Sequence, residues 1–432
     1  MPPVPGVEEP GRLRRLAGSA AIDIGPLRRH RDFRFLFVGQ AASFFGSMVT
    51  YVALPYQTYQ LTRSTLAVGL LSLAEFVPLM IMAFIGGALS DAFDRRRMVQ
   101  IAELGSGLGI GILLVNALLS QPRTWVLFAV APILAALYGI FRPSLDAMVP
   151  RLVTKEELPA ASALEGFRGT LGEIAGPALA GIIIATAGLP IAYAIDAATY
   201  GISLAALWFM RAIPPPADAP PVSLGGIAEG VRYAWSRRDL LGTYAVDMIA
   251  MFFGMPMALF PAIAADFGGA GVLGLLYTAP AVGSLLATVA SGWVSRVHRH
   301  GLAIIVAATV WGLGIIVFGL AADLWLALVS LVVAGGADMV SGIFRMTMWN
   351  QTIPDRLRGR LAGIEQVSYT SGPLLGNLEA GVVASLTSVR TSVVSGGVLC
   401  VVGVALAAVA LPAFRLYDAR TSRSDSPRVG AL

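Results

Sequence analysis

The stretch Thr65–Met98, TLAVGLLSLAEFVPLMIMAFIGGALSDAFDRRRM, decides the class of the fold. It begins as a long apolar run with a single charge, Glu75, and ends with three consecutive arginines, Arg95–Arg97, before Met98. A helix needs about 20 apolar residues to cross the hydrocarbon layer of a bilayer, and arginines collect in the cytoplasmic loops. The stretch therefore predicts a membrane-spanning helix followed by a cytoplasmic loop.

The rest of the chain has the same character. Of its 432 residues, 56% are hydrophobic and only 13% are charged, whereas soluble proteins carry about 25% charged residues. Backbone groups in lipid must be paired within their own segment, which favours helices over open strands. We expect an all-α integral membrane protein with twelve transmembrane helices near residues 34–59, 65–90, 98–120, 124–148, 158–186, 189–210, 240–265, 270–294, 301–321, 323–348, 360–387 and 391–414.

The basic residues predict the orientation, because cytoplasmic loops carry an excess of arginine and lysine. With the N-terminus inside, the outer loops hold only Arg63, Arg123 and Arg390. Both termini are therefore expected in the cytoplasm. The first 32 residues lack an apolar core with a cleavage site and are expected to form a polar tail. The net charge of +5 is spread over short loops, so we expect no nucleic-acid partner.

A proline-rich stretch, Ile213–Gly226, divides the chain, because proline removes backbone donors and favours extended linkers. We expect five regions: a tail (1–32), a six-helix bundle (33–211), a linker (212–239), a second six-helix bundle (240–414) and a tail (415–432). The end of the linker places four apolar side chains on one helical face: Ile227, Val231, Ala234 and Trp235. This pattern predicts a short helix on the membrane surface, with a solvated loop helix as the alternative.

Four features recur in the same order in both halves, at offsets of 196 to 205 residues. They are Gly87 and Gly292, the GIFR tetrapeptides ending at Arg142 and Arg345, Pro150 and Pro354, and Gly176-Pro177 and Gly372-Pro373. Internal repeats of this kind are typical of secondary transporters, in which substrate binds near the midplane between the repeats. The sequence therefore predicts a transporter with two related halves.

The loop Gly86–Met98 resembles the conserved loop of the major facilitator superfamily. The matching residues are Gly87, Asp91 and Arg95, a glycine and an aspartate followed by closely spaced basic residues. The resemblance implies the twelve-helix major facilitator fold in two pseudo-symmetric bundles. It also implies a cytoplasmic latch in which Arg95 reaches an acid on the fourth helix, here Asp146. Simple anchoring of the loop by its positive charge is the alternative.

Arg142 precedes Asp146 by one helical turn, so we predict that Arg95, Asp146 and Arg142 form a cytoplasmic gate network. Arg345, the counterpart of Arg142 in the second half, has Trp349 one turn later instead of an acid. We therefore expect Arg345 to be mainly structural, with its long side chain near the membrane edge.

The fifth segment contains Gly172, Gly176, Pro177 and Gly181. This pattern resembles the helix-5 motif that the superfamily associates with antiporters. Small residues let helices pack closely, and proline bends a helix by freeing a carbonyl group. The motif favours export over uptake.

Resemblance to the superfamily extends from about Phe33 to Phe414. Leu61–Leu70, Gly86–Arg97 and Thr347–Ile364 are similar to the group of enterobactin exporters and bacterial drug efflux proteins. This group implies proton-coupled export of a siderophore or an amphipathic drug-like molecule by alternating access, across the inner membrane of a bacterium. One alternative is a proton symporter that imports a small nutrient, and a membrane-embedded enzyme or receptor is a remote one.

Charges inside the membrane are costly and usually face a cavity or a partner. A carboxyl group in an apolar cavity can exchange protons, because removal from water disfavours its charged form. The expected proton carriers are Glu75, Glu173 and Asp247, with Glu75 and Glu173 preferred. The expected substrate-cavity residues are Arg168, Glu165, Tyr51, Tyr56, Phe252 and Glu379. Glu165 and Arg168 are three residues apart, a spacing that permits an ion pair on one helix. Structural salt bridges remain the alternative for the carboxylates, and are favoured for Asp196, Asp338 and Glu379.

Enzymatic chemistry has no support in the sequence. The three histidines, His30, His298 and His300, fall in tails or loops, and Cys400 is the only cysteine. No paired metal ligands, phosphate-binding loop or nucleophile motif is present. We expect a monomer that needs no cofactor or metal, is driven by the proton gradient, and has a small-molecule substrate, protons and the bilayer as its partners.

Overall fold

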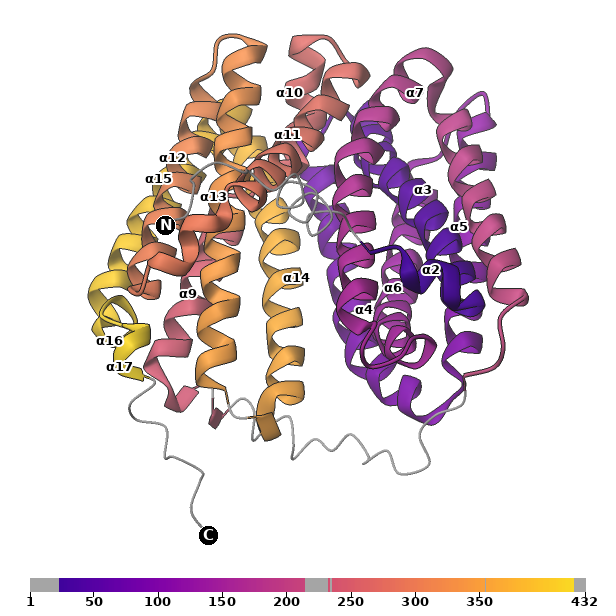
Figure 1. The fold of residues 1–432 in the computed structure, drawn as a ribbon. Helices are drawn as coiled ribbons and strands as arrows, with labels where there is room; N and C mark the ends of the chain where they lie inside the picture. The colour runs from indigo at the N-terminus through magenta and orange to yellow at the C-terminus, as the bar shows by residue number, and fades with distance from the viewer. Residues whose placement is uncertain (1–22, 214–231, 234, 354, 423–432) are drawn as a thin grey trace, which may run out of the picture.

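The computed structural model describes residues 23–213, 232, 233, 235–353 and 355–422; within these ranges it leaves out the side chains of residues 84, 87, 88, 90–92, 355–368, 421 and 422. All its regular elements in these ranges are helices (Figure 1). The first half contains α2 (Gly25–Arg29), α3 (Arg31–Thr62), α4 (Thr65–Ala92), α5 (Arg95–Leu118), α6 (Thr124–Leu152) and α7 (Leu158–Trp208).

The second half begins with α9 (Arg238–Phe253), the 3₁₀ turn η1 (Met257–Leu259) and α10 (Phe260–Phe267). It continues with α11 (Ala270–Val289), η2 (Ser291–Arg296), α12 (His300–Leu320), α13 (Leu324–Thr352), α14 (Asp355–Leu386), α15 (Val389–Ala410), α16 (Pro412–Arg415) and α17 (Ala419–Ser422).

The long helix α7 is two membrane spans in sequence. Gly188 interrupts its 51 residues with φ of 82°, a left-handed conformation that glycine adopts without steric cost. The two arms correspond to the expected segments 158–186 and 189–210. Counting α7 once, and Arg238–Phe267 (α9 to α10) as one span, ten of the described helical segments are long and apolar enough to cross a membrane. The eleventh long helix, α14, has 32 residues. The expected all-α membrane fold is confirmed.

Local sequence explains where several helices begin. Ser64, Asp94 and Asp323 are the residues before α4, α5 and α13, and each side chain accepts a hydrogen bond from a backbone N–H in the first turn of its helix. Serine and aspartate favour this position because they satisfy donors that the helix leaves free. The short loops of the bundle therefore carry the signals that end one span and start the next.

The seventh expected segment, residues 240–265, is not one continuous helix. α9 ends at Phe253, and Gly254 and Pro256 precede η1 and α10. Proline removes a backbone donor, and the Asn377 side chain of α14 accepts a hydrogen bond at 2.9 Å from the backbone N–H of Ala258. A polar side chain from another helix thus satisfies the interrupted backbone.

Each half packs mainly on itself. α3 to α7 contact one another on one side of the molecule, and α9 to α15 on the other (Figure 1). The halves meet where α4 lies against α14 and α7 against α11. Glycines permit both contacts: a Cβ atom on Gly381 would lie 3.0 Å from Cα of Gly69, and one on Gly181 would lie 2.8 Å from Cα of Gly274. The two halves therefore touch backbone to backbone.

Both contacts lie toward the same end of the molecule. Gly69 follows the start of α4, and Gly181 precedes the kink at Gly188, so both lie far from the end where α7 stops and α9 begins. We call the end at Trp208 and Arg238 the linker end and the opposite one the far end. The halves are held together toward the far end.

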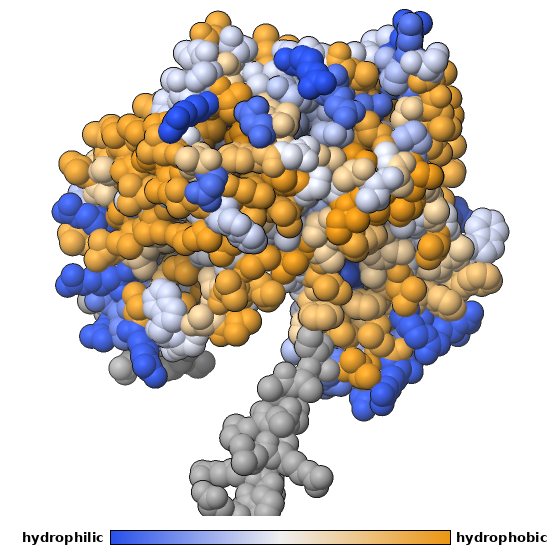
Figure 2. All heavy atoms as spheres, turned by 90° about the horizontal axis from the view of Figure 1, so that it is seen from above, coloured by the Kyte–Doolittle hydropathy of each residue, from blue (hydrophilic) through white to orange (hydrophobic). Residues whose placement is uncertain are grey.

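The outer surface fits a bilayer. Seen from above, it has broad areas of hydrophobic side chains, with hydrophilic ones in smaller groups (Figure 2). Trp125 and Trp325 are exposed where α6 and α13 begin, and Trp208 is exposed where α7 ends. These positions lie at both ends of the bundle, as expected for an aromatic belt at each membrane interface.

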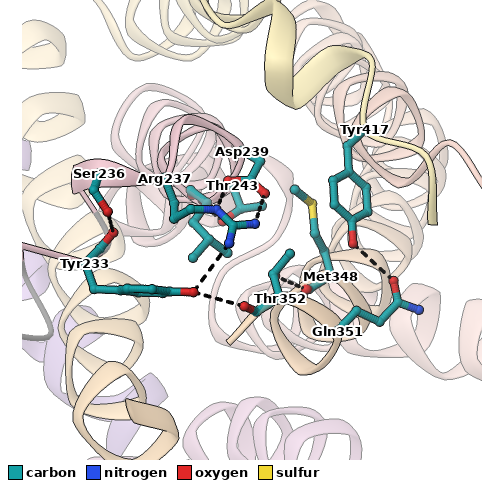
Figure 3. A network of polar contacts seen from close by, with 10 residues as sticks. Tyr233, Ser236, Arg237, Asp239, Thr243, Met348, Gln351, Thr352 and Tyr417 are labelled. Carbon is teal, nitrogen blue, oxygen red and sulfur yellow. Dashed lines mark hydrogen bonds and ion pairs between the residues drawn. The ribbon is translucent and has the colours of Figure 1, made fainter. Parts of the chain in front are cut away.

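A polar network fixes the linker end of the second half (Figure 3). Arg237 donates to Asp239 at 3.0 and 2.6 Å, and this ion pair raises the pKa of the guanidinium. The Tyr233 hydroxyl donates to the carbonyl oxygen of Thr352 at 3.1 Å. The start of α9 is thus tied to the end of α13. The expected amphipathic helix lies mostly outside the described residues, because residues 214–231 and 234 are not among them.

A second polar cluster fixes the linker end of the first half. Glu157, just before α7, accepts hydrogen bonds from His30 and, at 2.8 Å, from Nη1 of Arg29. These hydrogen bonds hold the pKa of the Glu157 carboxyl below its ordinary value. They fasten α2 and the start of α3 to the start of α7.

Candidate substrate cavity between the two halves

A cavity of about 550 Å³ lies between the two halves. Its walls come from α3 to α7 on one side and from η1, α11 and α14 on the other. Seven aromatic side chains line it: Phe44, Tyr51, Tyr138, Phe141, Tyr200, Tyr277 and Tyr369. An apolar cavity of this size with a few polar groups suits a small-molecule ligand.

Glu103 of α5 is the centre of one polar group on the cavity wall. Its side chain is 2% exposed and accepts hydrogen bonds from Nε2 of Gln40 at 2.9 Å and from the Ser43 hydroxyl at 3.1 Å. Gln40 also donates to the hydroxyl of Ser203 at 3.2 Å. One carboxylate thus joins α3, α5 and α7 through neutral donors.

Asp196 of α7 forms a second polar group nearby. It is fully buried and accepts a hydrogen bond from the Thr50 hydroxyl of α3. Gly46 makes the approach possible, since a Cβ atom there would lie 2.5 Å from Oδ1 of Asp196 and 2.0 Å from the Thr199 hydroxyl. Asp196, which the sequence favours as structural, lines the cavity as well.

Arg168 supplies positive charge to the cavity wall. Its Nη2 and Nε atoms lie 2.7 and 3.1 Å from Oε2 of Glu165, so the pairing that the sequence predicts is present. Nη1 donates to the carbonyl oxygen of Gln40 at 3.0 Å, and the guanidinium lies 5.4 Å from the ring centre of Phe44. Arg168 therefore lines the cavity. Glu165, which is not among the lining residues, binds its guanidinium group and fixes its position.

Tyr51, expected in the substrate cavity, and Glu75, expected as a proton carrier, both line this cavity. The Tyr51 hydroxyl donates to the Met257 sulfur at 3.1 Å, and its ring packs edge-on against Tyr277 with ring centres 5.3 Å apart. Tyr51 belongs to the first half and its two partners to the second. This aromatic contact therefore joins the two halves at the cavity wall.

Other expected residues lie off the cavity lining. Tyr56 packs against the main hydrophobic core, and Phe252 packs edge-on against Phe253. Glu379 is half-buried on α14 and is not one of the lining residues. Glu173 is exposed on α7 and interacts electrostatically with Arg142. Their place on the helix was predictable, but the direction of their side chains was not.

Asp247 and Arg345 form a buried ion pair inside the second half. Nη2 of Arg345 also lies 3.7 Å from Asp338, and the guanidinium is 5.2 Å from the ring centre of Tyr369, which lines the cavity. Arg345 thus has acidic partners, although none of them lies one turn later on its own helix. Sequence spacing within α13 could not reveal Asp247, which comes from α9.

The expected gate network is present in part. Nε of Arg142 lies 3.2 Å from Asp146, and Arg142 lines the cavity. Among the described side chains, the ion pairs of Asp146 involve Arg142 alone. Arg95 is buried at the start of α5, where its backbone N–H donates to the carbonyl oxygen of Ile213. Gly87 and Asp91 lie on α4, outside the described side chains.

The helix-5 motif provides close packing on two sides. Cβ atoms on Gly172 and Gly176 would lie 2.4 Å from the Phe44 and Met48 side chains of α3. Gly181 and the carbonyl oxygen of Pro177 face Gly274 of α11. The motif thus lets α7 lie close to α3 and also forms one of the contacts between the halves.

Sequence reasoning missed Glu103 altogether. The signal was present, because Glu103 is an isolated acid in an apolar helix, and such acids usually have a function. Its partners Gln40 and Ser43 are polar residues in another apolar segment. Within the described ranges, no group of three His, Cys, Asp or Glu side chains is placed to hold a metal ion.

Comparison of the chain with known proteins identifies its family. A family model described as transmembrane secretion effector matches residues 21–430. The chain belongs to the transmembrane secretion effector family. This is a family of the major facilitator superfamily, so the protein is a multi-pass membrane transporter and not an enzyme.

Curated relatives cover nearly the whole chain. The enterobactin exporter EntS of Escherichia coli O1:K1 / APEC is 29% identical over 423 residues, which cover 95% of this chain and 98% of the relative. EntS of Citrobacter koseri is 28% identical over 392 residues, which cover 89% and 93%. The similarity to these relatives extends over most of this chain and most of each relative.

Solved structures share the fold. A POT family transporter in complex with 5-aminolevulinic acid has a TM-score of 0.72 at 12% identity, covering 89% of this chain and 97% of that chain. The nucleoside transporter NupG has a TM-score of 0.65 at 14% identity, covering 89% and 98%. At these identities the likeness concerns the fold alone.

Proposed function

We propose that the protein is a proton-coupled exporter of a siderophore or a similar amphipathic aromatic molecule. The observation that carries the proposal is the cavity between the halves, whose lining combines seven aromatic rings with Glu75, Glu103, Asp196 and Arg168. The relatives named as enterobactin exporters support this substrate class. The protein acts as a monomer in the inner membrane of a bacterium, with both termini in the cytoplasm, and needs no cofactor.

Transport proceeds by alternating access. The contacts of α4 with α14 and of α7 with α11 hold the halves together toward the far end. In the orientation predicted from the basic loops, this is the end outside the cell. The cavity then receives substrate from the cytoplasmic side, and release to the outside requires these glycine contacts to separate while the Arg142–Asp146 side closes.

Carboxylates on the cavity wall carry the proton. Glu75 and Glu103 are the preferred carriers, because both line the cavity and the hydrogen bonds of Glu103 come from neutral groups. Asp247 is bound to Arg345, so we assign it to the internal structure of the second half. Arg168, held by Glu165, binds acidic or phenolic oxygens of the substrate.

Substrate-dependent proton movement tests the proposal. Inside-out vesicles containing the protein are energised, and a pH-sensitive dye follows the proton release that enterobactin evokes. Glu75→Gln and Glu103→Gln are each expected to reduce this release at least about tenfold, as is typical when a positioned proton carrier is lost. Glu156→Gln, an exposed loop position, is the matched control.

Two results would contradict the proposal. One is that enterobactin evokes no proton release in vesicles with the unaltered protein. The other is that both cavity variants release protons as fast as the Glu156→Gln control. Equal amounts of folded protein in all vesicles are verified by size-exclusion chromatography after extraction.

A further inference from the structure

The second half has a groove on its side, separate from the cavity between the halves. Its volume is about 810 Å³, and it runs between α12 and α13, with Ala287 of α11 at its edge. The loop before α12 and the C-terminal segment close it toward the linker end. None of its lining residues belongs to the cavity proposed for the substrate.

The walls of the groove suit a hydrocarbon chain. Leu302, Val306 and Val310 come from successive turns of α12. Across from them, α13 contributes Val333, Gly336, Ala337 and Val340. At 1.5 Å rise per residue, the apolar stretch of α12 from Leu302 to Val310 is about 12 Å long. The lining side chains of both helices are apolar and mostly short, so a hydrocarbon chain can lie along them.

The end of the groove toward the linker end is polar and mainly basic. It contains His298, Arg299, Asp418 and Arg420. Arg299 and Arg420 are exposed, so their guanidinium groups are open to solvent or headgroups. Two arginines against one aspartate leave this end with an excess of positive charge.

The C-terminal segment is fixed in place at this end. The backbone N–H of Ala419 donates to the carbonyl oxygen of His298 at 2.9 Å, and Nη2 of Arg420 lies 3.0 Å from Nδ1 of His298. The N–H of Arg420 donates to Asp418 at 2.9 Å. The Arg420 side chain is therefore held beside the loop that carries Arg299, although the two residues are far apart in sequence.

We propose that this groove is a binding site for an anionic phospholipid. One acyl chain lies between α12 and α13, and the headgroup phosphate lies between Arg299 and Arg420. Charge complementarity selects an anionic lipid over a zwitterionic one, because basic pockets at membrane edges bind acidic headgroups. Trp293, exposed at the rim of the groove, lies beside the bound lipid. The proposal does not rest on the transport activity.

Fluorescence quenching by brominated lipids tests it. The full-length protein in detergent micelles is titrated with brominated phosphatidylglycerol or brominated phosphatidylcholine. The difference between the unaltered protein and Trp293→Phe isolates the quenching of Trp293. The association constant for phosphatidylglycerol is expected to exceed that for phosphatidylcholine by about fivefold for each arginine that contacts the headgroup.

Charge variants then locate the headgroup. Arg299→Gln and Arg420→Gln are each expected to lower the preference about fivefold, and Arg299→Lys to retain most of it. Arg296→Gln is the matched control, since Arg296 is exposed on the same loop but does not line the groove. Size-exclusion profiles identify any variant that fails to fold, and the lysine variant then carries the comparison.

Three outcomes overturn the proposal. The first is equal quenching of Trp293 by both lipids, and the second is a loss of preference in Arg296→Gln as large as in Arg299→Gln. The third is that sodium phosphate, but not sodium chloride at equal ionic strength, removes the preference, which assigns the site to free phosphate. A preference confined to Arg299 and Arg420 and unaffected by phosphate supports the lipid site.

Discussion

Enlarging the glycine contact between α7 and α11 is expected to shift the protein away from its present conformation. In Gly181→Ala the added Cβ atom would lie 2.8 Å from Cα of Gly274 and 2.9 Å from the carbonyl oxygen of Ala270. Carbon atoms pack at about 3.5–4.0 Å, so the helices must separate by roughly 1 Å. The neighbouring atoms are backbone and cannot turn aside.

The cost of such overpacking is about 1–3 kcal/mol. If the contact exists only while the far end is closed, the whole cost falls on that conformation. The ratio of closed to open molecules then falls by about 5-fold to 150-fold, since 1.4 kcal/mol corresponds to a factor of ten. This is enough to move a largely closed population to a mixed or open one.

Double electron–electron resonance measures the separation directly. Spin labels are placed on cysteines at Thr186 of α7 and Leu275 of α11, both exposed. Cys400 is fully buried and is expected to stay unlabelled. The unaltered protein should give mainly the short distance of the packed helices, and Gly181→Ala should transfer population to a longer one.

A second alanine on the same helix provides the control. A Cβ atom on Gly169 would meet nothing within 4 Å, so Gly169→Ala changes the residue type without changing the packing. Identical distance distributions for Gly181→Ala and Gly169→Ala would refute the reasoning that this contact belongs to one state of the transport cycle.

Three further predictions concern the stability of single contacts. Gly242→Ala places a Cβ atom 2.2 Å from the Phe414 ring and should destabilise the second half by about 1–3 kcal/mol, measured by thermal unfolding in detergent. Asp247→Asn removes the buried carboxylate beside Arg345 and should cost about 3 kcal/mol in the same assay. Glu157→Gln should be less stable than the unaltered protein at neutral pH, because the Glu157 pKa is lowered in the folded state. The difference should start to shrink as pH falls below about 4.3, the ordinary pKa of a glutamate, and should vanish only below the lower folded-state pKa, where the carboxyl group is protonated in both states.

Matched variants separate these effects from general damage. Gly201→Ala adds a Cβ atom that meets nothing within 4 Å and should leave the unfolding temperature unchanged. Asp338→Asn should cost less than Asp247→Asn, because Asp338 lies 3.7 Å from the arginine and is 40% exposed. Glu156→Gln, at the neighbouring exposed position, is the control for Glu157→Gln. Equal losses of stability in Gly242→Ala and Gly201→Ala, or in Asp247→Asn and Asp338→Asn, would contradict the stated contacts. A stability difference between Glu157→Gln and the unaltered protein that grows in acid would also contradict them.

The fold could be predicted from the sequence because a membrane restricts both the spans and the loops of a chain. Each span must be a helix with about 20 apolar residues, and the loops must carry capping and basic residues. The interruption at Gly254–Pro256 was not predicted, because the amide of Ala258 is satisfied by Asn377 of a different helix. The kink at Gly188 falls between the expected segments 158–186 and 189–210, so the two arms of α7 match the two predicted spans.

The cavity was less predictable, since it depends on side chains from helices far apart in the chain. The Glu165–Arg168 pair was found because its members are three residues apart on one helix. Glu103 was missed because its hydrogen-bond partners Gln40 and Ser43 belong to another helix. Periodicity places a residue on a face of a helix, but it does not say which helix that face meets.

The direction of coupling between protons and substrate is the most direct test of the proposed export. Purified protein is reconstituted in liposomes, the membrane potential is clamped to zero, and a pH gradient is imposed in either sense while labelled enterobactin is present outside. A proton antiporter should accumulate enterobactin when the lumen is more acidic than the medium, and should show no accumulation when the gradient is reversed. Accumulation only when the medium is the more acidic side would identify a symporter and contradict the proposal.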